Sequence, residues 1–375
     1  MSPRSSSSSS ARKPGTSPAR PTTSTGVFAL AETPASPAAP APRTPAPRTP
    51  ARTERPSLAV PSRIPVPHAP RDWPIAAAML QFPPHAADGT PVAELEPGEW
   101  RRLLQPVVDE GFTQLELSTA WLPLGDLDRS RLTALRDVLD DAGLAVPGVG
   151  VVRRSVLHPE RGGDNLAFSH RTIDAAAALG TDVVCLGLHD TLSPEQRRAL
   201  WFWTVPGGDV PPSADPEVRA LAVRLFRELG DHAADAGVEL SLELYEGTYL
   251  GSADEAVRFL DDIGHDKVGL NPDLGNLLRA QRPVDTWEYL VSVTAPRTNY
   301  WHVKNYARLE DPATGTVLTH PTSLELGVID YRAAVRYAIS HGFGGTLVVE
   351  HYGGDGLSVG ATNAAYLRRV LPRAR

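Results

Sequence analysis

Cysteine is nearly absent from this chain, and long hydrophobic runs are missing. Among 375 residues the only cysteine is Cys185, so no disulfide forms within the chain, and we expect a protein of the reducing cytoplasm. Cys185 lies in a short apolar run, which predicts a small core residue rather than a thiol nucleophile. No apolar run approaches the roughly 18 residues that a membrane-spanning helix needs. We therefore expect no membrane association.

Positive charge is also scarce outside the N-terminal region. The net charge is −7, and residues 1–70 carry +7 of their own, so the remaining residues carry −14. A nucleic-acid groove requires clustered Lys and Arg side chains. We therefore expect no nucleic-acid partner.

Residues 1–70 differ in composition from the rest of the chain. They are rich in Ser, Pro, Ala, Thr and Arg and hold 16 of the 36 prolines. Such a segment buries too little apolar surface to offset its ordering entropy, so it is predicted to be disordered and to precede one folded domain at residues 71–375. Its longest apolar stretch, Val27–Ala31, is too short for a secretory signal. Its composition is like that of a transit peptide, but a linker or a start codon assigned too early is the favoured explanation.

The folded part alternates short apolar runs with longer amphipathic ones. Eight such pairs predict an α/β fold, a (β/α)8 TIM barrel. A doubly wound open sheet is the rival, but Phe82-Pro83-Pro84-His85 stands where its glycine-rich phosphate turn belongs. The eight predicted strands are 75–82, 113–118, 146–152, 182–188, 239–245, 267–271, 299–304 and 345–350. The predicted helices are 99–110, 129–142, 165–179, 216–236, 253–263, 286–293, 331–341 and 362–370.

Polar side chains mark the C-terminal ends of four predicted strands. Alternation along a strand places Glu243, Asp273, His302 and Glu350 on the lumen side, where barrel enzymes keep their chemistry. Lys304 shares the parity of His302. The same alternation predicts that Gln81, Glu116 and His189 also face inward.

Buried carboxylates in one lumen need a counter-charge, since isolated ones are costly. A divalent cation bound by Glu243, Asp273, His302 and Glu350 would provide it, and oxygen and imidazole ligands favour Mn²⁺, with Mg²⁺, Co²⁺ or Zn²⁺ as alternatives. Two open positions would suit a keto-sugar. Glu243 and Glu350 would then remove and return a proton next to its carbonyl through an ene-diolate. The alternative to a metal is charge compensation by Lys304.

Further residues are candidate substrate contacts. Lys304 would hold a substrate oxygen, while His189 and Glu116 face the lumen with a structural role as the alternative. Trp203 lies in a Gly- and Pro-rich insertion, residues 201–215, and either stacks on a sugar or packs against a neighbouring subunit or loop.

Four sequence motifs resemble the xylose-isomerase-like TIM barrels, the superfamily of sugar phosphate isomerases and epimerases. They are "LSLELYEG", "VGLNPDLGN", "WHVKN" and "TLVVEHYGG". The resemblance covers about residues 75–372 and implies that Glu243, Asp273, His302 and Glu350 bind the metal, with the two glutamates as the acid/base pair. It also implies that Arg308 contacts the substrate. Asn276 stands where many members have His, and Asn305 where Asp is common, which leaves the substrate open.

Three other functions stay open. "NYWHVKNYAR" and "EHYGGDG" are similar to the catalytic subunits of bacterial C-glycoside deglycosidases, lyases that cleave 3-keto-glycosides by β-elimination and pair with a small second subunit. A homo-oligomer is the alternative assembly. A non-catalytic sugar-binding barrel would need no metal. Endonuclease IV shares the barrel, but its three-zinc cluster needs more His and Asp than this acidic chain offers.

Overall fold

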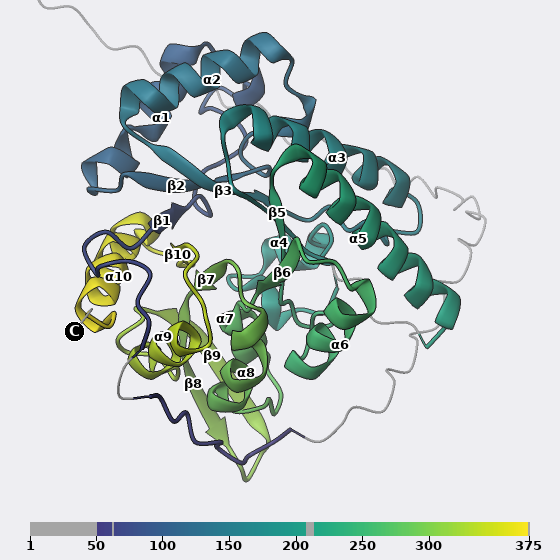
Figure 1. Ribbon diagram of the computed structural model, residues 1–375, viewed down its shortest axis with the longest axis vertical. Coiled ribbons are helices and arrows are strands. Elements are labelled where there is room, and N and C mark those ends of the chain that lie inside the picture. Colours follow the sequence, from purple (N-terminus) through teal and green to yellow (C-terminus); the bar gives the residue numbers. More distant parts are fainter. Residues whose placement is uncertain (1–50, 62–63, 208–213, 374–375) are drawn as a thin grey trace, which may run out of the picture. The chain divides into compact units, whose positions relative to one another are not determined.

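The computed structural model describes residues 51–61, 64–207 and 214–373, which contain a barrel of parallel strands surrounded by helices (Figure 1). One eight-stranded sheet has the order β6-β5-β4-β3-β2-β1-β10-β7, and every neighbouring pair is parallel. Its strands are β1 (Ile75–Ala78), β2 (Gln114–Ser118), β3 (Ala145–Val151), β4 (Val183–Leu186), β5 (Glu239–Glu243), β6 (Val268–Asn271), β7 (Trp301–Val303) and β10 (Leu347–Val349). The predicted (β/α)8 fold is confirmed.

The ring closes at a seam between β6 and β7. Only an isolated parallel bridge, Leu270 to Thr298, joins this pair in the described residues, with Asn299 N donating to Leu270 O at 3.2 Å. A side chain adds a further link, because Asn271 Oδ1 accepts from His302 N at 2.8 Å. The seam therefore depends on two asparagines more than on a continuous ladder.

Helices fill the spaces between strands as the apolar spacing predicts. The longer helices are α1 (Pro97–Asp109), α2 (Arg129–Ala142), α3 (Gly162–Leu179), α5 (Pro216–Ala236), α6 (Ala253–Ile263), α8 (Trp287–Thr294), α9 (Tyr331–Ser340) and α10 (Gly356–Val370). Local chemistry sets their ends: Asp128 caps α2 by accepting from Arg131 N, and Gly143 ends it at a φ of 66°. Two short helices, α4 (Pro194–Arg198) and α7 (Leu274–Leu278), follow β4 and β6.

Side-chain alternation divides the interior into two cores. Leu240, Leu242 and Leu244 belong to the large core between sheet and helices. The lumen holds a separate small cluster, formed by Ala76, Ala78, Val183, Cys185, Tyr300 and Val348. The prediction for Gln81 was wrong, because β1 ends at Ala78 and Gln81 is exposed in the turn that follows.

A two-stranded hairpin follows β7 and was not predicted. Its strands β8 (Asn305–Asp311) and β9 (Thr316–Thr322) pair antiparallel and lie outside the barrel sheet (Figure 1). Its strands mix polar and apolar residues, and the cross-strand pair Leu309 and Leu318 is exposed, so it lacks the continuous apolar run that identified the barrel strands. The turn sequence Asp311-Pro312-Ala313-Thr314-Gly315, followed by Thr316 and Val317, was the available signal.

Residues 51–61 and 64–70 form an extended segment on the outside of the barrel. Arg52 pairs with Asp254 at 3.0 Å and its guanidinium lies 4.1 Å from the ring of Tyr289. Leu58, with two further apolar side chains of the segment, packs on the main core. The segment predicted at 1–70 lies otherwise outside the described residues, and the domain boundary at residue 70 stays a prediction.

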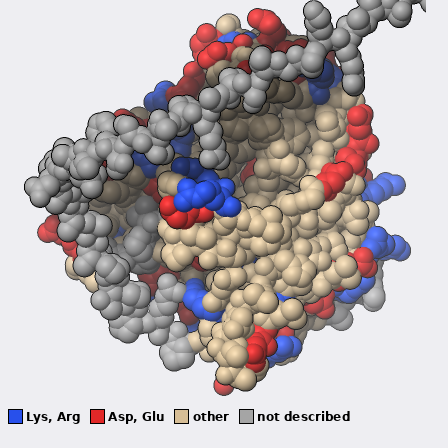
Figure 2. All heavy atoms as spheres, turned by 180° about the vertical axis from the view of Figure 1, so that it is seen from behind, with Lys and Arg blue, Asp and Glu red and all other residues tan. Residues whose placement is uncertain are grey.

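The surface in Figure 2 carries small groups of acidic and basic side chains rather than an extended basic stripe. Among the described helices, none combines the length and the apolar character that crossing a bilayer requires.

Candidate metal centre

Four ligand-type side chains meet at the C-terminal end of the barrel. Glu243 is the last residue of β5, Asp273 follows β6, His302 lies within β7 and Glu350 directly follows β10. Parallel strands bring their C-terminal ends to one face, so residues far apart in sequence become neighbours. Asp273 is fixed further as the N-cap of α7, where its Oδ1 accepts from Asn276 N at 3.1 Å.

His302 stands at the centre of this group. Its Nδ1 lies 3.3 Å from Glu350 Oε1 and 3.7 Å from Glu243 Oε1. Ligand atoms of Glu243, Asp273 and His302 all lie within 4.8 Å of one another. Nδ1 is buried and makes no hydrogen bond to any described residue. A nitrogen in this position, facing carboxylates and lacking a partner, fits a metal ligand.

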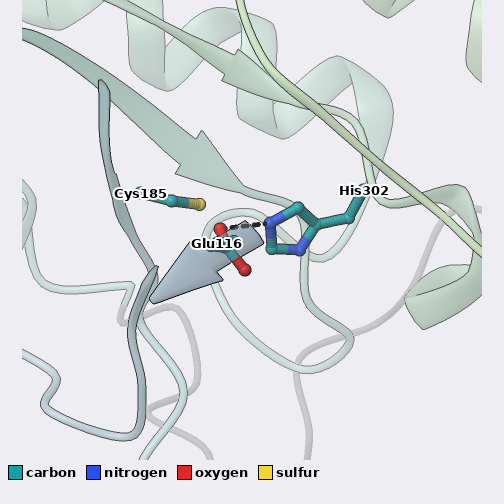
Figure 3. Close-up of side chains that lie close together, drawn as sticks. All are labelled: Glu116, Cys185 and His302. Carbon is teal, nitrogen blue, oxygen red and sulfur yellow. Dashed lines mark hydrogen bonds and ion pairs between the residues drawn. The ribbon is translucent and has the colours of Figure 1, made fainter. Parts of the chain in front are cut away.

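The other ring nitrogen of His302 is held from below. Glu116 Oε1 lies 2.8 Å from Nε2, and Figure 3 shows the Glu116 carboxylate between the imidazole and the thiol of Cys185. A carboxylate on the far nitrogen orients a metal-ligating histidine. Glu116 was predicted as a substrate contact. It lines the cavity, and its carboxylate is bonded to His302, which it orients.

Cys185 offers a second set of neighbours for a metal, since its Sγ lies within 4.8 Å of ligand atoms of Glu116 and His302. Burial raises the pKa of the thiol well above its ordinary value. Asn271 Nδ2 also donates to Sγ at 3.3 Å. A protonated thiol is a poor ligand, so the carboxylate set above His302 is the stronger candidate.

Lys304 lies behind the ligands. Its Nζ is 2.6 Å from Asp273 Oδ2 and 2.5 Å from Glu350 Oε2. Its side chain is only 3% exposed, and it is absent from the cavity lining. This geometry orients two carboxylates, and the predicted contact of Lys304 with substrate stays a prediction.

The ionisation of the centre reflects crowded negative charge. The pKa of Asp273 is raised to about 7. Burial is the main cause and the charges of Glu350 and Glu243 add to it, while the charge of Lys304 opposes the shift. Burial also lowers the pKa of His302, but the charges of Glu116 and Glu350 outweigh it and hold that pKa well above its ordinary value. The position between these carboxylates thus favours positive charge, which a divalent cation would supply. The donor set fits such a cation.

A cavity of about 50 Å³ opens above His302. Glu243 and Glu350 line it on one side, while Arg153, His189 and Tyr245 line another part. His189 stacks on Tyr245 with ring centroids 4.4 Å apart. Burial lowers the pKa of His189 to about 3, so its ring is neutral near pH 7. The structure thus brings the predicted contact His189 to the cavity.

Two predicted substrate contacts lie elsewhere. Trp203 is 9% exposed, donates from its indole to Thr319 and stacks on Trp201, within an aromatic cluster outside the cavity lining. Arg308 donates to the carbonyls of Leu278, Ala280 and Arg282 and so fastens the hairpin to the chain after α7. Residues 208–213 of the insertion lie outside the described residues.

Sequence reasoning did not assign two residues of the site. Asn276 Nδ2 donates to Glu243 Oε1 at 2.8 Å and to Leu244 O at 3.0 Å, which orients the glutamate. Its position three residues after Asp273 was the available signal. Arg153 lines the cavity with a φ of 57°, a backbone state that no sequence pattern indicates.

Comparison with known proteins gives the family. Residues 104–370 match the family described as "Xylose isomerase-like TIM barrel". The chain belongs to this family. A xylose-isomerase-like TIM barrel protein from Mycobacterium smegmatis, solved in complex with magnesium, is 43% identical, with a TM-score of 0.77 over 81% of this chain and 98% of that chain.

More distant solved structures share the fold. A 3-keto-D-glucoside 4-epimerase from E. coli is 15% identical, with a TM-score of 0.55 over 80% of this chain and all of that chain (100%). A D-allulose 3-epimerase from Methylomonas sp. is 16% identical, with a TM-score of 0.54 over 80% of this chain and 98% of that chain. No curated protein matches the sequence.

Proposed function

We propose that the protein is a divalent-metal-dependent sugar isomerase or epimerase that abstracts a proton next to the carbonyl of a keto-sugar. The observation that carries this proposal is the unpartnered, buried Nδ1 of His302 facing Glu243 and Glu350. Glu243, Asp273, His302 and Glu350 would hold the cation. When bound, the cation would supply Lewis-acid stabilisation of the negative charge that develops on the substrate oxygens.

The two glutamates divide the proton transfer. Burial raises the pKa of Glu243, but the neighbouring charges of His302 and Lys304 outweigh it and hold that pKa well below its ordinary value, so Glu243 stays ionised and accepts the proton from carbon. Glu350, held by Lys304 at 2.5 Å, takes up a proton from solvent and delivers it to the ene-diolate from a different strand, while Glu243 releases the abstracted proton to solvent. Asn276 keeps the Glu243 carboxylate aligned throughout.

The relatives support the class of chemistry. The M. smegmatis protein was solved with magnesium, and the named activities of the more distant structures include epimerases and a mannonate dehydratase. We propose Mn²⁺ or Mg²⁺ as the metal, with Co²⁺ or Zn²⁺ as alternatives, because hard oxygen ligands predominate in the site.

The test measures metal content and proton exchange together. Elemental analysis of the purified full chain should find about one Mn²⁺ or Mg²⁺ per chain, and ketose substrates incubated in D₂O should take up deuterium at the carbon next to the carbonyl. A protein that binds sugars without exchange would instead be a non-catalytic binding barrel. Three Zn²⁺ per chain would indicate a nuclease-type cluster.

A second candidate is β-elimination from a 3-keto-glycoside, as in C-glycoside deglycosidases. Tyr352 at the cavity edge favours it, because this ring contacts Phe202 and Trp203 at centroid distances of 5.7 and 5.5 Å and joins a surface suited to an aromatic aglycone. Release of a free aglycone from a 3-keto-glycoside, without epimer formation, would decide for it. A small second subunit, a homo-oligomer and a cytoplasmic location stay predictions.

A further inference from the structure

Arg153 has an unusual backbone at the cavity. It follows β3 and is the only non-glycine residue in the described ranges with a positive φ, 57°. Side chains with a Cβ are disfavoured there, and residues held in such states are concentrated at functional sites. The conformation turns Arg153 toward the cavity, which its side chain lines together with His189 and Tyr245.

The guanidinium of Arg153 has no carboxylate partner among the described residues. Its Nη1 donates to the backbone carbonyl of Asp190 at 2.8 Å, its Nη2 lies 3.4 Å from the Tyr245 hydroxyl, and its Cζ is 4.9 Å from the ring centre of Phe202. The Asp190 carboxylate pairs instead with Arg161 at 2.7 Å. A guanidinium carries five N–H donors, so Arg153 retains donors for a ligand.

The neighbouring cations differ in this respect. Arg279 pairs with Glu246 at 2.8 Å, and Lys304 pairs with Asp273 and Glu350. Among the described residues that line the cavity, Arg153 is therefore the cation without a carboxylate partner. The pKa of His189 reflects these neighbouring cations. Burial lowers that pKa most and the charge of Glu243 raises it, while the charges of Arg153, Arg279 and Lys304 each lower it further.

We propose that Arg153 binds an oxyanion of the substrate, so that the enzyme acts on an acidic keto-sugar carrying a carboxylate or a phosphate away from the reacting carbonyl. The inference rests on the proposed function, because the metal centre fixes the carbonyl end. A planar fork that offers parallel N–H bonds recognises either oxyanion. Neutral sugars would leave this guanidinium without a partner.

The experiment uses three ketoses that are alike near the carbonyl and differ at the sixth carbon: D-fructose, D-fructuronate and D-fructose 6-phosphate. Calorimetric titration into the Mn²⁺-loaded full chain should give tighter binding for at least one anion, and the two anions distinguish carboxylate from phosphate. Arg153→Gln should weaken that binding by about 10- to 100-fold, as expected for a hydrogen bond to a charged group. Arg153→Lys should retain part of it, and D-fructose binding should not change.

Arg161→Gln is the matched control, because this arginine lies nearby but outside the cavity lining, and it should leave anion binding intact. Arg153→Gly relieves the backbone strain, so it should lose anion binding without lowering the Tm. Equal affinity for all three ketoses, binding of no anion, or an unchanged affinity in Arg153→Gln would overturn the inference. If the inference about Arg153 fails, deuterium exchange with neutral ketoses would still support the proposed function. If anion binding depends on Arg153 but no exchange occurs, the proposed function is contradicted and the anion-binding role of Arg153 stands.

Discussion

The two halves of the barrel differ in what they place in the lumen. Strands β5, β6, β7 and β10 provide or precede the four candidate metal ligands, whereas β1, β3 and β4 provide Ala76, Ala78, Gly148, Gly150 and Cys185. One half thus holds the candidate ligands, and the strands of the other leave space beside them. Glu116 on β2 connects the halves through its bond to His302. The comparison teaches that the chemistry depends on a few side chains of one half and on the small size of residues in the other.

The largest expected effect comes from removing a carboxylate from the half formed by β5, β6, β7 and β10. Glu350→Gln should lower kcat at least about 1,000-fold, since loss of an acid/base group typically removes about 10²–10⁴ and a ligand is lost as well. The fold should persist, as judged by circular dichroism. Glu325→Gln, on an exposed pair with Arg369, is the control and should not change the rate. Normal turnover in Glu350→Gln would contradict the acid/base assignment.

The connection between the halves is tested by Glu116→Gln. Loss of the carboxylate behind His302 should weaken Mn²⁺ binding by about 10- to 100-fold, the usual effect of removing such an orienting group. Calorimetry on the metal-free protein measures it. Cys185→Ser alters the other neighbour of His302 and should leave the affinity unchanged; an equal loss in both variants would indicate general damage to the lumen.

The role of small residues is tested by two glycines of β3. A Cβ at Gly148 would lie 2.1 Å from the Tyr300 hydroxyl oxygen, whereas one at Gly150 would lie 3.4 Å from the nearest atoms of the Glu116 carboxylate. Gly148→Ala should therefore lower the free energy of unfolding by about 1–3 kcal/mol through overpacking. Gly150→Ala should fold normally but reduce sugar affinity. Urea unfolding and ligand titration distinguish the two, and equal stability losses would refute the distinction.

The smallest expected effect concerns His189, which faces the cavity from the end of the apolar half. Its folded pKa of about 3 lies below the ordinary 6.5. Its neutral form therefore stabilises the fold fully above pH 6.5, and this contribution is lost as the pH falls toward 3. At pH 5.5 the loss is on the order of 1 kcal/mol. His189→Phe keeps a ring for stacking on Tyr245, so it should lose less stability between pH 7 and pH 5.5 in urea unfolding. His320→Gln, at an exposed histidine, should behave like the unaltered protein.

The sequence predicted the barrel and the meeting of the four ligands because both depend on periodicity. Helices α2, α5 and α6 begin and end at the predicted residues, since caps and apolar spacing are local. Seven of the eight strands are shorter than predicted, because apolar runs continue into buried loops such as that after β4. The positions of Arg308, Trp203 and Arg153 could not be predicted, because each depends on contacts between distant segments or on a backbone state that composition does not encode.

The seam between β6 and β7 affects where the barrel opens by local unfolding. Asp273 follows one of these strands and His302 lies within the other, so this seam separates two of the four candidate metal ligands. Local unfolding would begin at this seam, and a cation bound by residues of both strands would oppose their separation. Amide hydrogens around Leu270 and Trp301 should therefore exchange with deuterium more slowly in the metal-loaded protein, while those of β2 and β3 should exchange at unchanged rates. Metal binding would then determine how often the barrel opens at this seam as well as whether the enzyme is active.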